Sequence, residues 1–123
     1  MQSAVAVNPA TEAILAISSG KSVKEARFGD YMVKGEVYVA KGGHNLLFHK
    51  DANGIMLHVN KPVKKEVFVP NINTTINSAI DIFGNRVVGV ILTGMGDDGA
   101  DAISRLYHKG GHTIAEAEST AII

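Results

Sequence analysis

The stretch Val87-Val88-Gly89-Val90-Ile91-Leu92-Thr93-Gly94-Met95-Gly96-Asp97-Asp98-Gly99 decides the fold, because an apolar run passes directly into a glycine-rich turn. The continuous apolar run Val87–Leu92 predicts a strand that is buried on both faces. After the turn, apolar residues at helical spacing continue to Gly110-Gly111, and a last strand is expected around Thr113-Ile114-Ala115. The order strand, helix, strand predicts a parallel βαβ unit.

A short helix and a small β region are expected before this unit. Asn8-Pro9 is typical of a helix start, and the helix that it begins ends at Ser18-Ser19-Gly20. Asp51-Ala52-Asn53-Gly54 is the strongest hairpin signal, because apolar segments flank it on both sides. The expected strands are Ser22–Ala26, Val37–Ala40, Asn45–Lys50 and Ile55–Val59.

From Asn71 the apolar period changes to three and four residues, which predicts a helix that ends at Gly84. The chain of 123 residues is long enough for one core and too short for two. The sequence therefore predicts a single α/β domain over residues 1–123. We expect a mostly parallel sheet flanked by helices, with one antiparallel β-hairpin.

Charge and composition exclude several classes of function. Twelve basic and twelve acidic residues give no net charge, so no nucleic-acid partner is expected. No segment approaches the ~20 apolar residues that span a bilayer, so no membrane insertion is expected. The chain has no cysteine, which removes disulfides and thiolate chemistry and makes the cytoplasm the expected location.

The spacing of Gly94, Gly96 and Gly99 also matches the glycine pattern of a dinucleotide-binding turn. A helix N-terminus in such a turn binds pyrophosphate, and Asp97 and Asp98 would place two negative charges against it. The pattern alone leaves two other interpretations of these carboxylates open. One is that Asp97 or Asp98 caps the following helix, and the other is that a carboxylate beyond a parallel strand orients a catalytic histidine.

The histidines do not occur at metal-ligand spacing, so we expect no metal and interpret them as surface or hairpin residues. His49 and His58 would approach each other across the expected hairpin, and a weak metal site there stays open. Ser19-Gly20-Lys21-Ser22 lacks the first glycine of a phosphate-binding loop and is rejected as one.

Val88–Gly99 resembles the signature of the chemotaxis receptor methylesterases, the CheB family of protein-glutamate methylesterase and glutamine deamidase. The order of elements from about Ser22 to Ile123 is similar to that family throughout. One departure is Pro70-Asn71-Ile72-Asn73, which stands where the family usually has Pro-Ser-Val-Asp. Other matching segments are Val23–Ala26, Gly29-Asp30, Gly35–Ala40, Gly42-Gly43 and Ala115–Ser119.

The resemblance implies a serine-histidine-aspartate triad in which Asp98 is the aspartate. It also implies an active-site loop made of Thr93, Gly94, Met95, Gly96 and Gly99, with no cofactor and no metal. The serine and histidine motifs of the family are absent from these residues, since no serine lies in a Gly-x-Ser-x-Gly turn. The chain is therefore expected to be the middle and C-terminal portion of a methylesterase domain and to be inactive alone.

The implied parent reaction is hydrolysis of glutamate γ-methyl esters, with deamidation of glutamine, on methyl-accepting chemotaxis receptors. A receiver domain of the same or another chain is the second implied partner. Two alternatives stay open at this point. The first is that the chain is a non-catalytic interaction or assembly module that forms homo-oligomers. The second, with less support, is that it is a Rossmann-type dinucleotide-binding segment.

Overall fold

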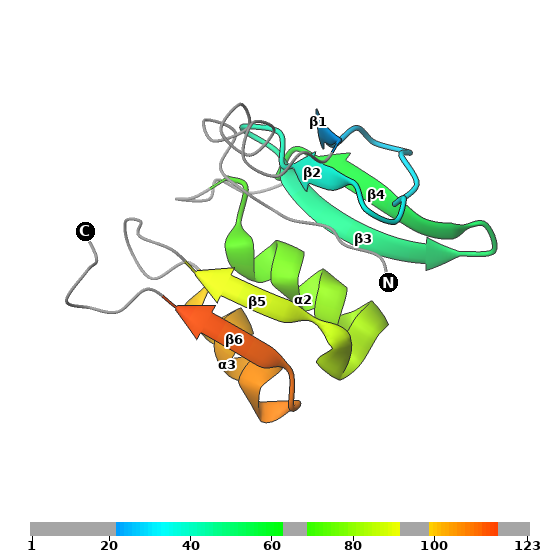
Figure 1. Cartoon of the computed structure of the whole chain (residues 1–123). Coiled ribbons are helices and arrows are strands. Elements are labelled where there is room, and N and C mark those ends of the chain that lie inside the picture. Colours follow the sequence, from blue (N-terminus) through cyan, green and yellow to red (C-terminus); the bar gives the residue numbers. More distant parts are fainter. Residues whose placement is uncertain (1–21, 63–68, 92–98, 116–123) are drawn as a thin grey trace.

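The computed structural model describes residues 22–62, 69–91 and 99–115, in which four strands precede a part where helices and strands alternate (Figure 1). The elements are β1 (Val23–Glu25), β2 (Val37–Val39), β3 (Asn45–Asp51), β4 (Gly54–Asn60), α2 (Ile72–Phe83), the 3-10 helix η2 (Gly84–Arg86), β5 (Val88–Ile91), α3 (Ala100–His108) and β6 (His112–Ala115). The helix expected from Asn8 lies outside the described residues.

The described strands pair in three sheets of two strands each. β1 pairs with β2 in parallel, β3 with β4 in antiparallel, and β5 with β6 in parallel. The expected hairpin and the expected parallel βαβ unit are both confirmed. The chain is thus an α/β protein in which two of the three described strand pairs are parallel.

Helix α2 begins and ends where its local sequence signals lie. The Asn71 side chain accepts a hydrogen bond from the Thr74 amide at 2.9 Å, so Asn71 is the N-cap. Gly84 ends the helix with a φ of 58°, and its amide donates to the Ile80 carbonyl. No helix among the described residues is long and apolar enough to cross a membrane.

The main core lies around the β3–β4 hairpin. Its buried side chains come from the hairpin, from β2 and the residue after it, and from the loop between β1 and β2, and Phe48, Ile82 and Phe83 pack against them. Three backbone bonds join the loop to β4: the Gly29 and Met32 amides donate to the Leu57 and Ile55 carbonyls, and the Leu57 amide donates to the Asp30 carbonyl. The buried residues of this core are Ala26, Met32, Tyr38, Ala40, Leu46, Ile55 and Leu57.

The expectation that the Val87–Leu92 strand is buried on both faces is wrong for the chain as described. Gly89 faces inward and is buried, whereas Val88 is 58% exposed and Val90 is 49% exposed. Helix α3 packs against the inward face, because a Cβ on Gly89 would lie 2.5 Å from Ile103. None of the described elements buries the opposite face, and Ile114 of β6 is also 56% exposed there.

Tyr38 ties the loop before β2 to the core. Its side chain is 1% exposed, and its hydroxyl accepts the Val33 amide at 2.8 Å and donates to the Tyr31 carbonyl at 3.3 Å. Burial raises the pKa of this hydroxyl, which therefore stays protonated as a donor.

Replacing Tyr38 by phenylalanine removes both bonds and leaves the Val33 amide without this acceptor. We expect Tyr38→Phe to lower the free energy of unfolding by about 1–2 kcal/mol. The matched control is Tyr107→Phe, because Tyr107 is 68% exposed. Urea denaturation of the two variants measures the difference, and equal stabilities would contradict the assigned role of the Tyr38 hydroxyl.

Candidate functional site

The candidate site is the turn between β5 and α3, at the carboxyl end of a parallel strand. Strand β5 ends at Ile91, and α3 begins at Ala100 with Gly99 as its N-cap. In open α/β sheets, ligands and catalytic side chains gather beyond the carboxyl ends of the strands. Of the residues expected in this loop, Gly99 is described, and Thr93, Gly94, Met95, Gly96 and Asp98 lie outside the described residues.

Gly99 fits a position that other residues do not. Its φ is 97°, in the left-handed region that residues with a Cβ rarely adopt. A Cβ here would also lie 2.9 Å from Cγ2 of Ile72 and 3.0 Å from Cδ1 of Ile91. Gly99 therefore packs between α2 and β5, and both its backbone conformation and its close contacts require glycine.

The first turn of α3 is capped by a side chain from α2. The Ala102 amide donates to Oδ1 of Asn73 at 2.9 Å, while the N-cap Gly99 has no side chain to offer. The sequence interpretation considered only Asp97 and Asp98 as caps and noted Asn73 merely as a departure from the family pattern. Asn73 and Ala102 are 29 positions apart, so local spacing gave no signal of this contact.

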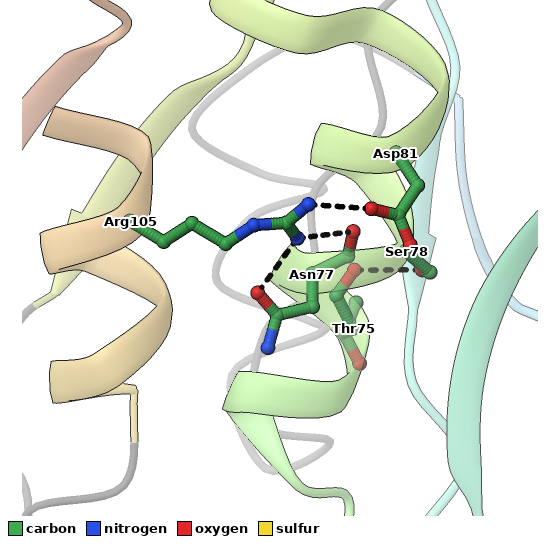
Figure 2. Close-up of polar contacts among 5 residues, drawn as sticks. All are labelled: Thr75, Asn77, Ser78, Asp81 and Arg105. Atoms are coloured by element: carbon green, nitrogen blue, oxygen red, sulfur yellow. Dashed lines mark hydrogen bonds and ion pairs between the residues drawn. The ribbon is translucent and has the colours of Figure 1, made fainter. Parts of the chain in front are cut away.

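Helix α2 holds both of its neighbours through polar contacts, and Figure 2 shows those that it makes with Arg105 of α3. Toward α3, the Arg105 guanidinium donates to Oδ1 of Asn77 at 3.0 Å and pairs with Asp81 at 2.7 Å. Toward the hairpin, the Ser78 hydroxyl accepts a hydrogen bond from the Phe48 amide of β3 at 3.0 Å. The same hydroxyl donates to the Thr75 carbonyl within α2. Because Arg105 and Asp81 are partly exposed, their pair mainly fixes the orientation of α3 and adds little stability.

The structure brings together two of the five histidines. The ring centroids of His49 and His58 are 5.0 Å apart on the hairpin, whereas His108 contacts the Ser104 carbonyl and His44 the Gly42 carbonyl. Within residues 22–62, 69–91 and 99–115, no three histidine, cysteine or acidic side chains form a group that could hold a metal.

A comparison with protein-family models identifies the family of the chain. The family model described as CheB methylesterase matches residues 4–123. The chain belongs to the CheB methylesterase family.

Named relatives and a solved structure agree with this CheB assignment. The chain is 38% identical over 99 residues to a protein-glutamate methylesterase/protein-glutamine glutaminase of Geobacter sulfurreducens, covering 80% of this chain and 27% of the relative. It is 44% identical over 106 residues to one of Symbiobacterium thermophilum, covering 85% and 28%. The Thermotoga maritima CheB methylesterase catalytic domain matches 99% of this chain and 68% of its own, with a TM-score of 0.85 and 28% identity.

The CheB-type chain thus spans less than a third of the length of the curated relatives that it matches. It spans about two thirds of the solved catalytic domain. The α/β fold is that of the methylesterase catalytic domain, and the described structure is a partial domain of this kind.

Gly99 offers a direct test of how tightly the loop end is held. We expect Gly99→Ala to lower the free energy of unfolding by about 2–4 kcal/mol, from strain at positive φ together with the contacts to Ile72 and Ile91. Gly110 is the matched control, because its φ is 86° and a Cβ there would meet nothing within 4 Å. Gly110→Ala should show only the backbone strain, about 1 kcal/mol. Chemical denaturation compares the two variants, and an equal loss would refute the packing component at Gly99.

Proposed function

We propose that this chain is part of a protein-glutamate methylesterase, which hydrolyses glutamate γ-methyl esters and deamidates glutamine on chemotaxis receptors. The observation that carries this proposal is the structural match to a CheB methylesterase catalytic domain over 99% of the chain. The printed names of the curated relatives, protein-glutamate methylesterase/protein-glutamine glutaminase, support the same reaction.

In the proposed mechanism Asp98 orients and stabilises a histidine. The Asp98 carboxylate accepts the Nδ1–H of the histidine and fixes its tautomer. The other ring nitrogen takes the proton of a serine hydroxyl as its oxygen attacks the ester carbonyl, and it then gives this proton to the leaving methoxide. Water hydrolyses the acyl-enzyme to the glutamate carboxylate, and in deamidation ammonia leaves in place of methanol.

The serine and the histidine of this triad are proposed to come from polypeptide outside the 123 residues. The serines present lie in no glycine-rich nucleophile turn, and the solved domain is longer than the part matched by this chain. Receptor helices and a receiver domain as partners, and a cytoplasmic location, belong to the same proposal. No metal or organic cofactor is required by these steps.

A chimera tests the proposed role of Asp98. Residues 4–123 replace the matching part of the Thermotoga maritima catalytic domain, and the rest of that domain is proposed to supply the serine and the histidine. We expect the chimera to release methanol from methylated receptors. Asp98→Asn should lower kcat by about 10⁴-fold, because the histidine then loses its correct tautomer.

The matched control is Asp97→Asn, which removes a neighbouring carboxylate of the same loop and should leave kcat within a few-fold. The 123-residue chain without the added segment should show no turnover of an activated ester, since it supplies neither nucleophile nor base. If the folded chimera with Asp98→Asn kept full activity, the assignment of Asp98 would be wrong.

We propose as a second candidate that the chain by itself is an assembly module. The exposed face of the β5–β6 pair favours this, because Val88, Val90 and Ile114 present an apolar surface to solvent. A second copy of the chain would cover the same surface across a two-fold axis.

Analytical ultracentrifugation tests this assembly. We expect the mass of the chain to rise toward a dimer with concentration, and Val90→Lys, which places a charge on the apolar face, to restore the monomer. Val33→Lys is the matched control, because Val33 is also exposed but lies in the loop before β2. A monomer at every concentration would rule the module out.

A further inference from the structure

The outward face of the β3–β4 hairpin carries two histidines that the methylesterase reaction does not use. His49 lies opposite Met56, and His58 lies opposite Leu47. Residues opposite each other in an antiparallel pair share a face, and so do alternate residues of one strand. His49 and His58 are therefore diagonal neighbours on one face, and their ring centroids are 5.0 Å apart.

This spacing suits two ligands of one metal ion. A zinc–nitrogen bond is about 2.0–2.1 Å long, so two imidazoles bound at a near-tetrahedral angle have centroids about 5 Å apart. The rings are tilted by 34°. Rotation about χ2 turns a histidine ring without moving the backbone, because this torsion is broad. Hence the ring nitrogens can be directed to a common ion while the strands keep their register.

The surroundings support one of the two rings and place a carboxyl group on the same face. The ring of Phe28 lies 4.8 Å from the ring of His58 and supports it from the loop after β1. On β3, Asp51 follows two residues after His49 on the same face. The Tyr31 hydroxyl and the Asn53 amide both donate to the Asp51 carboxyl at 2.7 Å and fix its orientation. This carboxyl group lies on the same face as the two rings, and a negative group there attracts a positive ion.

We propose that His49 and His58 form a binding site for a divalent transition-metal ion of the zinc type, with water completing the coordination. Imidazole nitrogens are common ligands of such ions. The ion bridges the two strands of the hairpin and so stabilises the folded form when it binds. The proposal does not depend on the methylesterase function, because it involves neither the β5–α3 loop nor helix α2.

Zinc chloride added to the intact 123-residue chain tests the site. NMR follows the ring signals of all five histidines, since Zn²⁺ is diamagnetic. We expect the His49 and His58 signals to shift together, with one common midpoint, at one ion per chain. Thermal unfolding should move to higher temperature over the same range of zinc concentration.

Single variants separate chelation from simple ring stacking. His49→Gln and His58→Gln should each weaken zinc binding by about tenfold or more, because a single imidazole remains to bind the ion. His112→Gln is the matched control, because His112 is exposed on β6 and should leave the affinity unchanged.

Three results would overturn the proposal. They are the absence of a zinc-induced shift in the His49 and His58 signals of the unchanged chain, unaltered affinity in both hairpin variants, and an equal loss in the His112 variant. The first is read on the unmodified protein, so it stands even if a variant fails to fold.

Discussion

The bond between the Asn73 side chain and the Ala102 amide joins the start of α2 to the start of α3. The first amides of a helix need partners from outside the helix, and here a second helix supplies one of them. Just before this point, Gly99 packs between Ile72 of α2 and Ile91 of β5. The position of Gly99 and of the first turn of α3 is therefore set by α2, although α2 is far from them in sequence.

The same helix also connects the two halves of the described structure. Its Ser78 hydroxyl accepts the Phe48 amide of β3, and its Asn77 and Asp81 side chains hold Arg105 of α3. At its N-terminus, the Asn71 amide donates to the Asn45 side chain at the start of β3. Because α2 contacts the hairpin on one side and α3 on the other, a change in α2 would move the start of α3 relative to the main core.

Local signals in the sequence were sufficient for the hairpin, for α2 and for the βαβ unit. Asp51-Ala52-Asn53-Gly54 predicted a turn because its chemistry is local, and the periodicity after Asn71 predicted a helix that ends at Gly84 as observed. The burial of β5 could not be predicted in the same way. An apolar strand does not specify which elements cover it, and in the described residues α3 covers one face while Val88 and Val90 remain exposed.

For the candidate site, the division between local and distant information is similar. The motif ending at Gly99 could be read from consecutive residues, and the role proposed for Asp98 follows from its resemblance to a family. The support from Asn73 required the fold, since no spacing rule connects residues 29 positions apart.

The two faces of the hairpin show why the metal site and the candidate loop can be studied separately. Leu46, Ile55 and Leu57 point into the core, whereas His49 and His58 occupy the opposite face. The path of contacts from an ion on that outer face to α2 runs through the backbone of β3, where the Phe48 amide donates to the Ser78 hydroxyl. Coupling between two sites requires an element with two alternative arrangements that both sites bias. The described structure holds α2 in one arrangement through its contacts to the hairpin and to α3. An ion bound on the hairpin is therefore expected to change stability and leave the position of α3 unchanged.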